Sequence, residues 1–176
     1  CFAARELETF GALRYDSSPM LDHGAAVARI VAEEVGLGRN STIAAIVHDV
    51  VRIAVQDHPE RLEELSATIR NDYGEEVLGI ALALSKISDI KLKASKEQAS
   101  DFRDMIVSYS EDPRVILIKL ADRLEVMRSL AMFPEKKRLK KSWESMNLYA
   151  EIAHKLGLYS LKSELEDLSL SYIEPE

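Results

Sequence analysis

The spacing of apolar side chains predicts helices along almost the whole chain. Sustained period-two alternation, the mark of a half-buried strand, is nearly absent from the sequence. Steps of three and four residues, which place side chains on one face of a helix, recur instead. The clearest run of this kind is Leu158, Leu161, Leu165, Leu168 and Tyr172. The pattern therefore predicts an all-α fold.

Proline and glycine residues divide this pattern into about nine helices. Pro59, Pro113 and Pro134 stand where a first helical turn would begin. Gly74 stands near a helix end, and residues 87–95 have the composition of a loop. The predicted helices span residues 1–12, 22–35, 40–54, 59–72, 74–87, 95–110, 113–131, 134–154 and 158–172.

Two of the predicted helices contain stretches that are apolar on nearly all sides. Residues 42–51 read TIAAIVHDVV, and residues 115–121 read VILIKLA and run directly into Asp122. A helix that is apolar all round belongs at the centre of a fold. We therefore expect His48, Asp49 and Asp122 to be polar groups carried into the core.

Ionisable groups on central helices indicate a metal site. A buried carboxylate is costly unless it is paired or bound to a metal. His23 at the start of another helix adds a second imidazole to this set. Imidazole and carboxylate ligands together suit Mn, Fe or Zn, and the carboxylate oxygens among them favour a harder ion. His48 and Asp49 are adjacent and point about 100° apart on a helix, so both can bind one ion only if it lies between those two directions. The alternatives are a chance dipeptide and a structural ion pair at Asp122-Arg123.

Composition limits the classes of function and partner. The chain has 176 residues, 47% of them hydrophobic, which predicts one domain with a sizeable core. A net charge of −7 argues against a DNA partner. The apolar runs are too short to span a bilayer, so we expect no membrane partner. The single cysteine, Cys1, allows no disulfide within the chain, which suits a cytoplasmic location.

Several segments along the chain match one known pattern: Arg14 with Pro19 and His23, His48 to Val51, and residues 114–124, 149–157 and 165–169 followed by Tyr172. Together they resemble the hydrolase domain of RelA/SpoT-type alarmone enzymes, which belong to the HD superfamily. Because the resemblance covers essentially the whole chain, it implies that residues 1–176 form an HD-type helical bundle. Because it starts at Cys1 rather than Met, we interpret the chain as a piece of a longer protein. The resemblance implies that this piece is the N-terminal fragment of a bifunctional RelA/SpoT-type protein.

The resemblance implies an activity and a cofactor. The implied reaction removes the 3′-pyrophosphate from guanosine tetra- or pentaphosphate, giving GDP or GTP, as part of the stringent response. The implied cofactor is Mn²⁺ or another divalent ion. A downstream synthetase domain is the implied partner within the full-length protein. The metal ligands carried over are His23, His48, Asp49 and Asp122.

The resemblance also implies residues that bind the substrate. Arg14, with Tyr15 beside it, matches a family arginine near the guanine base, where a planar guanidinium stacks well. Lys119 and Arg123 could face phosphate groups, although surface or structural ion pairs are the alternative for each. Ser129 matches a position that is usually threonine in the family.

The sequence departs from the family immediately after the histidine-aspartate pair. Family members usually have glutamate-aspartate where this chain has Arg52 and Ile53, and histidine-asparagine where it has Glu125 and Val126. The family carboxylates orient and activate the attacking water. Arginine stays protonated and isoleucine has no proton chemistry, so neither can replace them.

The two departures suggest a compensation. Arg52 lies four residues after His48, and Glu125 lies three after Asp122, so each shares a helix face with a predicted ligand. Our hypothesis is that Glu125 activates the water while Arg52 clamps a phosphate or pairs with Glu125. The alternative is a plain Arg52–Glu125 salt bridge in a degraded site.

Three functions remain open at this point. The first is an active Mn-dependent alarmone hydrolase, favoured because all four expected ligands are retained. The second is a catalytically weakened module that binds nucleotide and regulates a synthetase domain, favoured by the loss of the glutamate-aspartate pair. The third is another HD phosphohydrolase, against which the matches at Arg14 and residues 114–124 argue.

Overall fold

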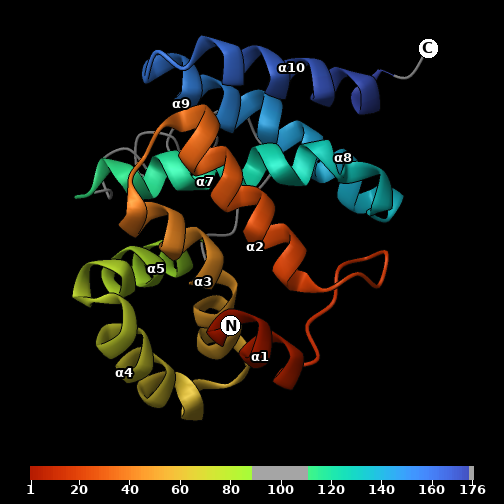
Figure 1. Cartoon of the computed structure of the whole chain (residues 1–176). Coiled ribbons are helices and arrows are strands. Elements are labelled where there is room, and N and C mark those ends of the chain that lie inside the picture. The colour runs from red at the N-terminus through yellow and green to blue at the C-terminus, as the bar shows by residue number, and fades with distance from the viewer. Residues whose placement is uncertain (89–110, 175–176) are drawn as a thin grey trace. The chain divides into compact units, whose positions relative to one another are not determined.

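The chain folds into helices that group into two compact units. The computed structural model describes residues 1–88 and 111–174, and Figure 1 shows them as coiled ribbons. By their internal contacts, residues 1–88 and 112–121 belong to the first unit, and residues 111 and 122–174 belong to the second. The expected all-α class and HD-type helical architecture are confirmed. That the two units make up a single domain stays a prediction.

The first unit is built around one central helix. Helix α3 contacts α1, α2, α4 and α5, as the sequence predicted for the apolar stretch 42–51. Its side chains are buried on several faces, with Ala44, Val47 and Val50 at most 2% exposed. The elements of this unit are α1 (Phe2–Thr9), α2 (Met20–Arg29), the π-helical η1 (Ile30–Val35), α3 (Arg39–Asp57), the 3-10 turn η2 (Pro59–Arg61), α4 (Leu62–Tyr73), α5 (Glu75–Ser88) and the first part of α7 (Pro113–Arg128).

The second unit is a smaller set of helices around α10. This helix contacts α8, η4 and α9 and buries Leu165 fully. Leu148 and Ile152 are also buried, at no more than 1% exposure. Besides the last part of α7, the elements of this unit are the 3-10 turn η3 (Leu130–Met132), α8 (Glu135–Glu144), the π-helical η4 (Ser145–Tyr149), α9 (Ala150–Lys155) and α10 (Tyr159–Ile173).

The helix boundaries follow the sequence signals closely. Pro59 begins η2, Pro113 begins α7, and Pro134 is the N-cap of α8. The predicted helices 22–35 and 134–154 each run without a break but widen locally into the π-helical stretches η1 and η4. The predicted helix at 95–110 and most of the predicted loop at 87–95 lie outside the described residues. Among the described residues, no helix combines the length and the apolarity needed to cross a membrane.

Candidate metal centre

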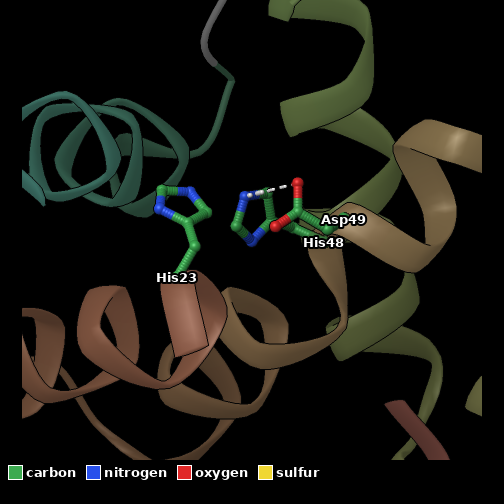
Figure 2. A group of neighbouring side chains, drawn as sticks. All are labelled: His23, His48 and Asp49. Carbon is green, nitrogen blue, oxygen red and sulfur yellow. Dashed lines mark ion pairs between the residues drawn. The ribbon is translucent and has the colours of Figure 1, made fainter. Parts of the chain in front are cut away.

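Two histidines and an aspartate converge inside the first unit. His23 comes from α2, and His48 and Asp49 come from α3 (Figure 2). One ligand atom from each side chain lies within 4.8 Å of the other two. All three residues are buried, at 8%, 7% and 3% exposure. The structure therefore brings together three of the four ligands predicted from the sequence.

The close approach of α2 to α3 depends on a glycine next to the first histidine. A Cβ atom added at Gly24 would lie 3.2 Å from the carbonyl oxygen of Ile46, on the turn of α3 that precedes His48. That distance is too short for ordinary van der Waals contact. Gly24 thus lets the two helices approach closely enough for His23 to reach His48, and their rings meet edge to face with centroids 5.7 Å apart.

The orientation of His48 prepares it to bind a metal ion. Its Nδ1 atom is hydrogen-bonded to the carbonyl oxygen of Ala45. Because a carbonyl oxygen only accepts, we assign the proton to Nδ1, which leaves the lone pair of the neutral ring on Nε2. Nε2 lies 3.5 Å from Oδ1 of Asp49, the interaction dashed in Figure 2. A backbone carbonyl that fixes the tautomer in this way is the usual outer-shell partner of a metal-binding histidine.

The donor set fits a divalent ion. Two imidazoles and one carboxylate offer the mixed nitrogen and oxygen ligands that suit Mn, Fe or Zn. A metal ion would offset the cost of burying the carboxylate of Asp49, whose side chain is only 4% exposed. His23, His48 and Asp49 would hold the ion. The coarser prediction, a metal site built from histidine and aspartate, is therefore supported by the geometry.

Arg52 has a partner that the sequence analysis did not name. Its Nη2 and Nε atoms donate to the same oxygen, Oδ1 of Asp49, at 2.8 and 3.1 Å. The contact joins residues three apart on α3, a spacing from which it could have been predicted. Glu125 belongs to the second unit. Its pairing with Arg52 therefore stays a prediction, and so does the role of Asp122 as fourth ligand.

Arg123 lies in a structural ion pair of the second unit. Its Nη2 atom is 2.9 Å from Oε2 of Glu144, and its guanidinium carbon lies 4.4 Å from the centroid of the Tyr149 ring. Both charged side chains are at most 10% exposed. The geometry favours the structural alternative named for Arg123 over a phosphate contact. The sequence analysis missed Glu144, because nothing in the local spacing links two residues that are 21 positions apart.

Two further predicted residues lie at the end of α7 in the second unit. Glu125 is buried at 6% exposure. Ser129 directly follows the helix, and its hydroxyl donates to the carbonyl oxygen of Glu125 at 2.9 Å. This hydrogen bond caps the last turn of α7 and gives Ser129 a structural task.

Arg14 and Tyr15 lie in the loop between α1 and α2. The backbone N–H of Arg14 donates to the carbonyl of Ser18 at 2.9 Å, and that of Ser17 donates to the carbonyl of Arg14 at 3.0 Å. The Ser18 hydroxyl donates to Asp16, which lowers the pKa of that carboxyl. These bonds hold the loop in a defined turn, and Tyr15 is 52% exposed on it. Lys119 is half-buried on the part of α7 that belongs to the first unit.

Comparison with known proteins identifies the class of this chain. The family model of the HD domain matches residues 1–159, so the chain belongs to the HD domain family. A guanosine-3′,5′-bis(diphosphate) 3′-pyrophosphohydrolase of Aquifex aeolicus is 40% identical to it over 163 residues, covering 93% of this chain and 22% of the relative. The bifunctional (p)ppGpp synthase/hydrolase SpoT of Escherichia coli K12 is 36% identical over 166 residues, covering 94% of this chain and 22% of the relative.

A third relative carries a different name. A probable GTP pyrophosphokinase of Mycobacterium leprae is 37% identical over 164 residues, covering 93% of this chain and 20% of the relative. The resemblance to RelA/SpoT-type proteins predicted from the sequence is confirmed by these matches. The chain spans about a fifth of the length of these curated relatives.

Proposed function

We propose that this domain hydrolyses guanosine tetra- and pentaphosphate at the 3′ position, releasing pyrophosphate and leaving GDP or GTP. The observation that carries the proposal is the buried convergence of His23, His48 and Asp49. It occurs in a chain similar over more than nine-tenths of its length to proteins named guanosine-3′,5′-bis(diphosphate) 3′-pyrophosphohydrolase. The stringent response is the setting in which such an activity would act.

Mn²⁺ is the cofactor proposed for this reaction. His23, His48 and Asp49 supply two nitrogen ligands and one oxygen ligand, and Asp122 adds a second carboxylate, which favours a hard ion. When bound, such an ion lowers the pKa of water and polarises phosphate oxygens. The backbone carbonyl of Ala45 keeps Nε2 of His48 available for coordination by holding the proton on Nδ1.

Glu125 is the proposed general base. It is a buried carboxylate that follows Asp122 by one helical turn, and no carboxylate remains at positions 52 and 53 to take a proton from the attacking water. Arg14 and Tyr15 offer planar groups on an ordered loop that would stack on the guanine base. Lys119 would contribute a positive charge to the phosphates.

A second function is favoured by the contact between Arg52 and Asp49. In this alternative the domain binds nucleotide, turns over slowly and regulates a synthetase domain in the full-length protein. Its support is that Arg52 donates to a proposed ligand, and that Ile53 is a buried apolar group where the family pattern implied by the resemblance has an acid. Neither residue can accept a proton from water.

One assay separates the two functions. The purified domain is incubated with guanosine tetraphosphate and Mn²⁺, with and without a chelator, and the release of pyrophosphate is followed. Release that the chelator abolishes supports hydrolysis, whereas tight nucleotide binding without release supports the regulatory module. Release that the chelator leaves untouched would overturn the metal-dependent mechanism.

A companion variant tests the base. Glu125→Gln keeps the shape of the side chain but removes its basicity, so kcat should fall by about 10²- to 10⁴-fold. Glu63→Gln, an exposed position on α4, serves as the matched control. An unchanged kcat in Glu125→Gln would remove Glu125 from the mechanism while leaving the metal centre in place.

A further inference from the structure

We propose that Arg52 is an internal counter-cation of the metal centre, one that holds Asp49 when no ion is bound and weakens the affinity for divalent ions. The inference rests on the metal site of the proposed function and assigns a role to Arg52, one of the positions at which the sequence departs from the family pattern implied by the resemblance. It makes Arg52 a positioning residue that acts through Asp49.

The geometric basis is a single shared oxygen atom. Oδ1 of Asp49 accepts from Nη2 and Nε of Arg52 at 2.8 and 3.1 Å. The same Oδ1 lies 3.5 Å from Nε2 of His48, the atom that presents a lone pair to the cluster. An ion held between Oδ1 and Nε2 would therefore bind an oxygen already engaged by a guanidinium. It would also lie close to that positive charge, which repels it.

The position of Arg52 makes the contact both persistent and reversible. It follows Asp49 by three residues on α3, so the helix keeps the guanidinium within reach of the carboxylate. The Asp49 side chain is only 4% exposed, and a poorly solvated carboxylate gains much from a cationic partner. The Arg52 side chain is 28% exposed, and its Nη1 lies 3.4 Å from Oε1 of the exposed Gln56. The guanidinium therefore has a route toward solvent.

Loading of an ion at Oδ1 then competes with the hydrogen bonds that Arg52 donates to this oxygen. The family pattern implied by the resemblance has a carboxylate at this position, and a carboxylate would attract an ion instead of repelling it. The arginine therefore makes the centre of this chain harder to load at low concentrations of divalent ion. Because the guanidinium is partly exposed, solvent screens the repulsion, and we expect an effect on affinity of about tenfold.

Calorimetric titration of the chelator-treated domain with MnCl₂ tests this role directly. Four proteins are compared: wild type, Arg52→Gln, Arg52→Lys and the control Arg39→Gln. Gln at position 52 removes the charge, Lys retains it, and Arg39 is an exposed arginine at the start of the same helix. We expect Kd for Mn²⁺ to fall about tenfold in Arg52→Gln and to stay within about threefold of wild type in the other two.

Thermal melts followed by circular dichroism check folding and give a second readout. With excess Mn²⁺, the rise in Tm should be larger for Arg52→Gln than for wild type, because a tighter ligand stabilises the folded state more. An unchanged or weaker Kd in Arg52→Gln overturns the role of Arg52 and leaves the metal centre intact. Failure of all four proteins to bind Mn²⁺ overturns the metal centre and this inference together.

Discussion

Two arginine–carboxylate pairs in this protein have the same chemistry and different surroundings. In the first unit, Arg52 donates to Asp49 at 2.8 Å, and in the second unit, Arg123 donates to Glu144 at 2.9 Å. The Arg123 pair is closed off: the guanidinium lies over the Tyr149 ring, and both side chains are at most 10% exposed. Arg52 is 28% exposed, and the Asp49 carboxylate to which it donates also faces His48.

The difference shows how surroundings decide what an ion pair does. The partners of Arg123 are a carboxylate and an aromatic face, which hold its charge in the core and leave it no other task. The carboxylate of Asp49 belongs to a set of three convergent ligand atoms, so a metal ion competes with Arg52 for it. The Arg123–Glu144 pair is therefore structural, and the Arg52–Asp49 pair is proposed to regulate access to a site.

The largest effect is expected from removing a ligand of the metal centre. His48→Ala should lower chelator-sensitive pyrophosphate release more than about 100-fold, since even outer-shell changes at metal sites cost about 10- to 100-fold. The measurement is steady-state release at saturating Mn²⁺. Replacement of the exposed His154 by alanine is the matched control and should leave the rate unchanged. Wild-type turnover by the His48 variant would contradict the assignment of the site.

The next largest effect, on the stability of the fold, is expected at the buried Arg123–Glu144 pair. Glu144→Gln leaves the buried charge of Arg123 without its counter-ion and should lower the free energy of unfolding in urea by about 3 kcal/mol. The matched change Glu164→Gln disrupts an ion pair with Arg128 in which both side chains are more than a third exposed, and should cost less than about 1 kcal/mol. Equal losses of unfolding free energy in the two variants would show that the burial of the Arg123–Glu144 pair adds nothing to its effect on stability.

A smaller effect on stability is expected at the partly exposed Arg52–Asp49 pair. Arg52→Gln should lower the free energy of unfolding of the metal-free protein by about 1 kcal/mol, because water reaches the guanidinium and glutamine keeps one donor. Saturating Mn²⁺ should reverse the loss. A cost as large as that of Glu144→Gln, unaffected by Mn²⁺, would place Arg52 among the structural arginines.

The smallest effect is expected at a partly exposed arginine cluster of the first unit, formed by Arg114, Glu76 and Asp112. Hydrogen bonds from Arg114 lower the pKa of Glu76 and of Asp112, and Asn40 adds to the effect on Glu76. Since the folded-state pKa values lie below the ordinary 4.5 and 3.8, the stabilisation is present at neutral pH and lost as the pH falls through the lowered values. Arg114→Gln should therefore lower Tm slightly at about pH 7 and not at about pH 2. A Tm difference that is equal at both pH values would contradict this linkage.

Much of the fold follows from the hydrophobic pattern because helical periodicity is a local property. The apolar run 42–51 was enough to predict a central helix, and the prolines at positions 59, 113 and 134 marked helix starts correctly. The convergence of His23 with His48 was predicted through a family resemblance. From their spacing alone, one could predict only that His48 and Asp49 can share an ion lying between their two side chains, and not which other residues complete the site.

The features that sequence reasoning missed depend on contacts that local patterns do not encode. The π-helical stretches Ile30–Val35 and Ser145–Tyr149 keep the helical periodicity nearly intact, so nothing in the sequence marked them. Glu144 pairs with an arginine on a different helix. Asp49, the partner of Arg52, lies three residues before it on the same helix, so the i,i+3 spacing could have predicted this contact.

Pulsed electron paramagnetic resonance of Mn²⁺ bound to the domain tests the central claim most directly. The account predicts nitrogen couplings from two imidazoles, reduced to one in His23→Ala and absent in the variant that lacks both His23 and His48. Mn²⁺ bound without any nitrogen coupling in the wild-type protein would contradict a centre built on these two histidines and Asp49.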